Sequence, residues 1–326
     1  MPLNIQQAKV VQQWPYERPL LQVRCEPSGR YAFASSEDRA ILRWDLNSGE
    51  KVPLRAHDSW VFAFAISPDG SQCLSGGGDG ELIWWPLTGD QPARSIAAHQ
   101  GWIRAIAVQP QGGLVATAGN DRVVRLWRCD SGELQGELTG HEKHVYSLLW
   151  HPTNGELLSG DLGGKIRVWN IADKSLVRTI EATALFAYDQ GQRVDFGGVR
   201  TMAWSLDSTQ LLAGGLHKAS NPLGAVHEPI VLRIQYADGT LVKSHVANGI
   251  TGGIAVRVMS LADGTIMAAS GGGSGGWLLF WNADADATIH QFQLPNLVRD
   301  ADLHPDGIRV VTTHSDSHLR VTALGS

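Results

Sequence analysis

The sequence contains a unit that recurs after roughly 42 residues, and this repeat constrains the fold more than any other feature. One copy runs from His99 to Trp127, and similar copies begin at His57 and His141. Repeats of this length and punctuation are typical of a four-stranded propeller blade, which cannot bury both of its faces alone. The equivalent positions are His57, Pro68, Ser75, Asp79 and Trp85; His99, Pro110, Thr117, Asp121 and Trp127; and His141, Pro152, Ser159 and Trp169.

A tight turn after the first strand of each repeat indicates the number of blades. Pro, Asp and Gly in these turns supply the fixed and the positive φ angles that a hairpin needs. No long segment keeps the 3.6-residue period of a helix, so the chain reads as all-β. We therefore predict one domain, a seven-bladed β-propeller with four-stranded blades. The turns are Glu26–Gly29, Ser67–Gly70, Gln109–Gly112, His151–Asn154, Ser205–Ser208, Leu261–Gly264 and His304–Gly307.

These repeats resemble those of the WD-repeat family, and the resemblance covers nearly the whole chain. They look most like the repeats of bacterial stand-alone WD-repeat proteins. The resemblance implies a propeller that serves mainly as a docking platform. It also implies that the recurring His, Ser or Thr, Asp and Trp form a buried hydrogen-bonded tetrad within a blade, in which the Trp N–H donates to the hydroxyl.

The same residue types could instead suggest a Ser-His-Asp catalytic triad. Repetition favours the structural interpretation, because an enzyme rarely builds one triad in successive blades. Blades two and three carry complete sets, whereas blade four has Gly163 in the aspartate position, and blades five and six have no set. The incomplete sets are Asp38 and Trp44 in blade one, His141, Ser159 and Trp169 in blade four, and Thr312 and Asp316 in blade seven, where Thr322 replaces Trp.

The two ends of the chain predict how the ring closes. The last repeat has only three predicted strands, and the segment Leu3–Val11 precedes the first blade with no strand of its own to pair with. We expect residues 1–14 to form the outer strand of blade seven, which would cover an open sheet edge. The predicted blades span about 15–56, 57–98, 99–140, 141–182, 183–246, 247–294 and 295–326.

Blades five and six are longer than the others. Their extra residues lie either before the first strand of a blade or between its second and third strands. Because antiparallel strands alternate in direction, both kinds of loop lie at one end of the ring, here called the insertion face. Such elaborated loops are more often functional than loops of minimum length, although drift in tolerated loops is the alternative. The insertions are Ala182–Gly198, Leu216–Pro229, Val246–Gly253 and Ser270–Gly276.

Large aromatic and basic side chains recur near the start of the innermost strands. In WD-repeat proteins these positions line the mouth of the central channel and commonly contact partners, and Trp, Tyr and Arg are enriched at binding hot spots. Four arginines around one axis would form a positive site for a carboxylate, a phosphate or an acidic peptide, unless each pairs with an acid such as Asp300 or Asp302. The candidates are Trp60, Phe62, Trp102, Arg104, His144, Tyr146, Arg200, Arg299 and, as an equivalent of these, Arg257.

Composition narrows the function classes. The net charge of -5 gives no global attraction to nucleic acid or to an acidic membrane. The three cysteines form no C-x-x-C pair, no signal peptide is evident, and no apolar run could span a bilayer, so we expect a cytoplasmic protein. Gly271–Gly276 lacks the phosphate-loop pattern and is read as a hairpin. His217, His227, His314 and His318 lack metal-ligand spacing, so neither a metal nor a cofactor is predicted.

These features predict a non-catalytic scaffold that binds a protein or peptide at the channel mouth and at the loops of blades five and six. A sensor that binds a small anion at the arginines is the alternative. A propeller hydrolase fits least, because no nucleophile–base pair stands apart from the tetrads. The sequence identifies neither the partner nor the oligomeric state.

Overall fold

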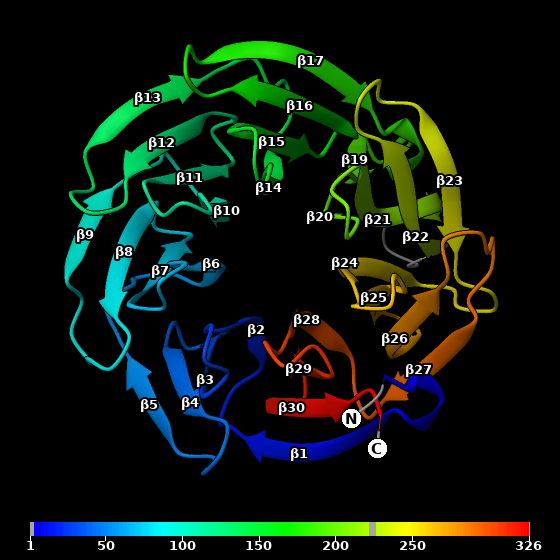
Figure 1. Ribbon diagram of the computed structural model, residues 1–326, viewed down its shortest axis with the longest axis horizontal. Helices are drawn as coiled ribbons and strands as arrows, with labels where there is room; N and C mark the ends of the chain where they lie inside the picture. The colour runs from blue at the N-terminus through cyan, green and yellow to red at the C-terminus, as the bar shows by residue number, and fades with distance from the viewer. Residues whose placement is uncertain (1–2, 222–225, 326) are drawn as a thin grey trace.

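The structure is a computed structural model that describes residues 3–221 and 226–325. Within these ranges, seven four-stranded antiparallel sheets surround a central axis, and one two-stranded sheet is added to them (Figure 1). The first strand of each blade lies beside the axis, and the fourth lies at the rim. The prediction of an all-β, seven-bladed propeller is therefore confirmed. No helix in the described ranges is long and apolar enough to cross a membrane.

The first four blades use consecutive strands from the axis to the rim. Blade one contains β2 (Leu20–Cys25), β3 (Tyr31–Ser36), β4 (Ile41–Asp45) and β5 (Lys51–Leu54). Blade two contains β6 (Val61–Ile66), β7 (Gln72–Gly77), β8 (Glu81–Pro86) and β9 (Arg94–Ala97). Blade three contains β10 (Ile103–Val108), β11 (Leu114–Gly119), β12 (Val124–Arg128) and β13 (Leu134–Leu138). Blade four contains β14 (Val145–Trp150), β15 (Glu156–Asp161), β16 (Lys165–Asn170) and β17 (Ser175–Glu181).

The remaining blades carry the longest strands and the junction of the ring. Blade five contains β20 (Thr201–Trp204), β21 (Gln210–Asn221), β22 (Val226–Gln235) and β23 (Leu241–Val246). Blade six contains β24 (Gly253–Ser260), β25 (Ile266–Gly272), β26 (Gly275–Trp281) and β27 (His290–Leu294). Blade seven contains β28 (Val298–Leu303), β29 (Arg309–His314), β30 (His318–Ala323) and β1 (Lys9–Pro15).

Neighbouring blades bury their apolar faces against one another rather than around a single core. Leu74 and Leu82 of blade two, for example, belong to one buried cluster with Ile103 and Val115 of blade three. The strand alternation places every second side chain in such an interface. Each blade is therefore stable only between two neighbours, which makes closure of the ring a condition of the fold.

The N-terminal strand β1 pairs antiparallel with β30 and is the outer strand of blade seven. The paired segment begins later than the Leu3–Val11 segment expected from the sequence, because residues Ile5–Gln7 form a short 3-10 helix, η1. Leu3 and Ile5 instead pack against the core between blades six and seven, and Trp14 packs against that between blades seven and one. The segment thus seals the ring with backbone hydrogen bonds and with apolar contacts.

The tetrads of blades two and three are complete and buried. His57 Nδ1 lies 3.0 Å from the Asp79 carboxylate, His57 Nε2 lies 2.8 Å from Ser75 Oγ, and Trp85 Nε1 donates to that oxygen at 2.8 Å. The equivalent distances in blade three, from His99, Thr117, Asp121 and Trp127, are 3.0, 2.7 and 2.8 Å. Each tetrad ties the loop that enters a blade to its second and third strands.

The aspartates of these two tetrads have lowered pKa values. Burial alone would raise the pKa of Asp121, but hydrogen bonds from His99 and Arg125 outweigh it, and His57 lowers the pKa of Asp79 in the same way. A carboxyl whose pKa is lower in the folded state stabilises the fold above its unfolded pKa of about 4. This stabilisation is lost as the pH falls through the folded pKa.

Blade four also has a complete tetrad, which corrects the prediction that it lacks the aspartate. Asp161 supplies the carboxylate, 2.7 Å from His141 Nδ1, while Ser159 Oγ lies 2.6 Å from His141 Nε2 and 2.8 Å from its donor Trp169 Nε1. Asp161 ends the second strand, where blade two has Gly77. A Cβ at Gly77 would lie 2.7 Å from His57 Nδ1, so a side chain at this position points at the ring. Glycine and aspartate have exchanged positions within one loop.

Other polar groups replace the tetrad where its residues are missing. In blade one, Tyr16 donates to Asp38 at 2.9 Å in place of a histidine, and the Trp44 indole N–H has no partner. In blade seven, His314 of β29 contacts Thr312 Oγ1 at 2.8 Å, and Asp316 pairs with Arg320 instead. The imidazole of blade seven therefore comes from the second strand rather than from the entering loop.

Deleting residues 1–12 should destabilise the protein strongly, because it removes half of β1 and leaves β30 as an open edge. We expect the melting temperature to fall by roughly 10 °C, which corresponds to about 3–5 kcal/mol for a domain of this size. A synthetic peptide of residues 1–16, added to the truncated protein, should restore part of the loss. Equal melting temperatures for the truncated and the intact chain would contradict closure by β1.

Exchanging glycine and aspartate in blade four tests the relocated carboxylate. Asp161→Gly should cost about 1–3 kcal/mol in the free energy of unfolding, because the buried His141 N–H loses its acceptor. Adding Gly163→Asp to that variant recreates the order found in blades two and three and should recover most of the loss. Chemical denaturation of the single and double variants measures both effects. A double variant no more stable than Asp161→Gly would refute the exchange.

Candidate functional site

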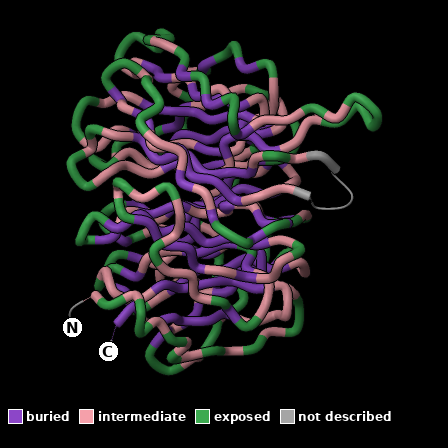
Figure 2. Tube along the Cα trace, turned by 90° about the vertical axis from the view of Figure 1, so that its right-hand side faces the viewer, coloured by how far each residue is buried: buried purple, intermediate pink, exposed green. Residues whose placement is uncertain are grey.

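The insertions of blades five and six form one continuous structure on the insertion face. The first folds into η2 (Thr183–Leu185) and a hairpin of β18 (Phe186–Asp189) and β19 (Val194–Gly197), which packs against β21. This hairpin projects from the same side of the ring as the described ends of β21 and β22, opposite the two chain termini (Figure 2). Lys143 of blade four pairs with Asp195 at 2.7 Å and holds the hairpin from its other side.

The third and fourth insertions are short and closely packed. His227 of β22 accepts a hydrogen bond from Gly252 N through its carbonyl oxygen, and its ring contacts Gly253 O at 2.8 Å. Gly271 and Gly276 pair across the β25–β26 hairpin, as the sequence predicts for this glycine run. A Cβ at Gly271 would lie 1.9 Å from Val298 O, so glycine is needed there because blade seven lies against the hairpin. The fourth insertion is therefore a longer strand pair, and not an elaborated loop.

The predicted mouth residues of blades two to five form a continuous ladder of aromatic and guanidinium groups. Phe62 stacks on Trp102 with ring centroids 4.7 Å apart, and Trp60 meets Phe62 edge-on at 6.2 Å. Arg104 lies over the Trp102 ring at 4.3 Å and over the Tyr146 ring at 5.2 Å, and Arg200 lies over Tyr146 at 4.1 Å. Trp60 and Trp102 remain 42% and 38% exposed, so this ladder presents aromatic surface at the mouth.

The predicted arginines line a central cavity of about 290 Å³, and Arg24 lines it with them. Arg257 does not occupy the position equivalent to Arg104, which corrects the sequence alignment of blade six. It pairs with Ala269 beyond a β-bulge, as Ala63 of blade two pairs with Gly76, and Val256 takes the mouth position. Arg257 therefore lies one residue deeper along its strand.

The sequence left open whether these arginines pair with acids or form a free positive site, and the structure shows some of each. Arg257 Nη2 pairs with the buried Asp300 carboxylate at 2.9 Å, and Arg24 Nη1 pairs with the same group at 2.7 Å. Arg299, at the mouth, donates to Ser315 at 2.7 Å and lies 3.7 Å from Glu37. Arg104 and Arg200 have no carboxylate partner in the described ranges; Arg104 donates to Asn120 at 3.1 Å. Pairing accounts for three of these five arginines.

Asp300 and Asp302 hold the junction between the last blade and its two neighbours. The Asp300 carboxylate also accepts a hydrogen bond from Val23 N at 3.2 Å, and Asp302 accepts one from Cys25 N at 2.8 Å. The two carboxylates of β28 thus accept the hydrogen bonds of backbone N–H groups of β2 that a neighbouring strand on that side would otherwise accept. Burial raises the pKa of Asp302, which the neighbouring Arg24 and the Cys25 N–H only partly offset.

Repeat alignment alone did not identify Arg24 as a lining residue, because its position is occupied by alanine in blades two and three. The sequence did contain a signal that could have found it. Arg24 is a charged residue in the inner strand of blade one, and the equivalent position of blade seven holds the oppositely charged Asp302. His144 lies beside the ladder, and burial and Arg104 lower its pKa. No group of three or more His, Cys, Asp or Glu side chains in the described ranges could hold a metal ion.

Comparison with known protein families identifies the type of repeat. The family model of the WD domain, G-beta repeat, matches residues 50–86, 90–128 and 132–170. Each match contains one complete tetrad, that of blade two, three or four. These three segments of the chain are WD repeats.

Relatives among curated proteins match the same kind of repeat over short stretches. The small ribosomal subunit protein RACK1y of Oryza sativa subsp. japonica is 41% identical over 63 residues, 19% of this chain and 19% of its own length. Subunit I of eukaryotic translation initiation factor 3 from Scheffersomyces stipitis is 30% identical over 73 residues, 22% and 21% of the two chains. WD repeat-containing protein 1 of Gallus gallus is 38% identical over 69 residues, 20% of this chain and 11% of its own length. The chain thus matches about a fifth or less of each relative.

Replacing Asp300 by Asn should destabilise this protein by about 3–5 kcal/mol, because Arg24 and Arg257 would keep their charges without the buried carboxylate between them. Thermal and chemical denaturation measure the effect. Asp130→Asn removes an exposed carboxylate that pairs with Arg128, and this control should leave the melting temperature nearly unchanged. A similar response of both variants would show that Asp300 does not hold the junction.

Proposed function

We propose that this protein is a non-catalytic WD-repeat scaffold that docks a protein or peptide on the insertion face, in the cytoplasm and without a cofactor. The exposed aromatic ladder at the channel mouth carries the proposal. Trp60 and Trp102 present large aromatic surfaces beside arginines, which is the composition of interface hot spots. The β18–β19 hairpin extends the same face, with Tyr188 51% and Val194 42% exposed.

The tetrads support a scaffold rather than a hydrolase. The side chains of His57, His99 and His141 are at most 1% exposed, so a substrate could not reach the groups that resemble a catalytic triad. Their hydroxyl partners Ser75 and Thr117 are also fully buried and already accept a Trp N–H. Every hydrogen-bonding group of these sets has a structural role.

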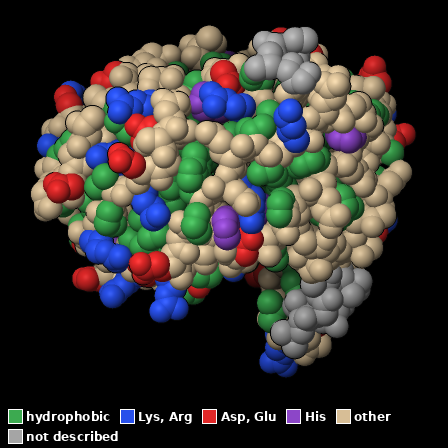
Figure 3. Space-filling view, turned by 90° about the horizontal axis from the view of Figure 1, so that it is seen from below, with side chains coloured by type: hydrophobic (Ala, Val, Ile, Leu, Met, Phe, Trp, Pro, Cys, Tyr) green, Lys and Arg blue, Asp and Glu red, His purple; other side chains and the backbone are tan. Residues whose placement is uncertain are grey.

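Surface charge and family relationship agree with a protein partner. The side of the ring seen in Figure 3 carries interspersed basic and acidic side chains and no block of one sign, which argues against a nucleic-acid or membrane surface on that side. Two of the relatives are by name a small ribosomal subunit protein and a subunit of an initiation factor, and so belong to larger assemblies. By analogy, we expect this chain to act through protein contacts.

The docking surface can be tested with Trp102→Ala and with a variant whose residues 187–196 are replaced by a short Gly-Ser turn. Partners are captured from cell extract on the intact protein, identified by mass spectrometry, purified, and their Kd values are measured by calorimetry. Truncating a hot-spot Trp costs about 2 kcal/mol, so we expect Trp102→Ala to bind about thirtyfold more weakly. The hairpin variant should lose at least tenfold, because it removes contact area from the same face.

Leu134→Ala is the matched control for this experiment, because Leu134 is 46% exposed on β13 at the rim. It should bind captured partners as the unmodified protein does. Partners that bind Trp102→Ala and the hairpin variant with unchanged affinity would place the docking surface elsewhere.

A further inference from the structure

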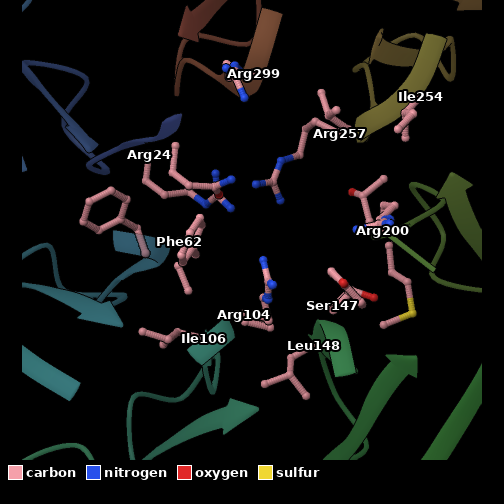
Figure 4. A pocket seen from close by; sticks show the side chains of 18 residues that line it. Arg24, Phe62, Arg104, Ile106, Ser147, Leu148, Arg200, Ile254, Arg257 and Arg299 are labelled. Atoms are coloured by element: carbon pink, nitrogen blue, oxygen red, sulfur yellow. The ribbon is translucent and has the colours of Figure 1, made fainter. Parts of the chain in front are cut away.

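The central cavity is lined by charged side chains of one sign only. Its charged lining residues are Arg24, Arg104, Arg200, Arg257 and Arg299, and no Asp or Glu lines it. The guanidinium ends of Arg24, Arg104 and Arg257 point toward the middle of the channel, and they come from blades one, three and six (Figure 4). Chain segments far apart in sequence thus direct positive charge into one small space.

The acids behind this lining neutralise only part of it. Asp300 is shared by Arg24 and Arg257, and Glu37 lies 3.7 Å from Arg299 at the mouth. Asp302 is the remaining buried acid near Arg24 and Arg257, and burial favours its neutral form. Even with every one of these carboxylates ionised, the cluster keeps an excess of positive charge.

The excess is concentrated on Arg104 and Arg200. Neither forms an ion pair within residues 3–221 and 226–325, and the buried Nε of Arg200 has no hydrogen-bond partner. Both guanidiniums lie over the ring of Tyr146, which attracts a cation but carries no net charge. Burial and the proximity of Arg200 lower the pKa of Arg104, an effect that arises when like charges lie near one another without an anion.

We propose that this cavity binds a small multivalent oxyanion of the phosphate or polycarboxylate class. Guanidinium N–H groups form charge-assisted hydrogen bonds with such oxygens, and a partly enclosed site strengthens them because water screens them less. A cavity of about 290 Å³ lies at the lower end of ligand-binding volumes, which suits a small anion and excludes a nucleotide-sized ligand. The cavity shares Arg104 and Arg200 with the ladder, but Trp102 and the β18–β19 hairpin, on which the docking test rests, do not line it, so the two proposals are tested separately.

Isothermal titration calorimetry of the purified full chain, in a buffer free of multivalent anions, tests the site. Phosphate and citrate are titrated separately, and sodium chloride of equal ionic strength is the reference. We expect saturable binding of at least one of the two anions, and a matching rise in melting temperature that chloride does not reproduce. Arg200→Gln and Arg104→Gln should each weaken that binding at least tenfold, whereas Arg200→Lys, which keeps the charge, should weaken it less.

Arg94→Gln is the matched control, because Arg94 also lies over an aromatic ring, that of Trp84, but at the rim and far from the channel. It should bind the anion with unchanged affinity. Circular dichroism and melting curves establish that each variant is folded. Binding of neither anion above the chloride reference, or equal binding by the folded Arg104→Gln and Arg200→Gln variants, would overturn the proposal. Failure of partner capture, by contrast, would leave the result of this titration unaffected.

Discussion

The fold depends on how the first and last blades are joined, because a ring of sheets has no stable open form. Two interactions make this junction. At the rim, β1 completes the sheet of blade seven. At the axis, Asp300 and Asp302 of β28 accept hydrogen bonds from the backbone of β2, and Asp300 also binds Arg24 and Arg257. A carboxylate placed in the innermost strand therefore links blades one, six and seven. Between blades five and six an uncharged group makes the equivalent kind of contact, since Thr201 Oγ1 accepts a hydrogen bond from Val258 N.

The tetrads tie the entering loops of the insertion face to their blades. Each one holds an entering loop against the second and third strands of its blade, at the end of the ring where the ladder lies. The regular tetrads occur in blades two to four, and the ladder residues Phe62, Arg104 and Tyr146 stand on the first strands of these same blades. The insertions lie in blades five and six, which lack the tetrad. The face thus combines a half whose loops are tied by tetrads with a half whose loops are elaborated, an arrangement suited to the proposed docking surface.

Residues that repeat at constant spacing could be predicted from the sequence. Residues that fill the same role from a different position in the repeat could not. Blade number, strand order and two tetrads followed from the period. Asp161 was not predicted to belong to the tetrad. A carboxylate at either end of a three-residue loop can contact the imidazole of His141, but a comparison of the repeats at one fixed spacing considers only one of these positions. Arg257 was misplaced by one residue because a β-bulge shifts the register. Arg24 was missed because its importance arises from its contact with Asp300 of the adjoining blade seven, in a segment 276 residues away along the chain.

The surplus of positive charge on the axis is not explained by stability. Apolar residues of similar volume would hold the channel at least as well, because burying a cation without its counter-ion is unfavourable. Apolar side chains do occupy neighbouring lining positions, since Ala63, Ala105 and Ile106 line the same cavity. The aromatic rings under Arg104 and Arg200 reduce the penalty by cation–π attraction, but they cannot donate a compensating charge. A feature that opposes folding yet is held in place by neighbouring rings points to a role in binding.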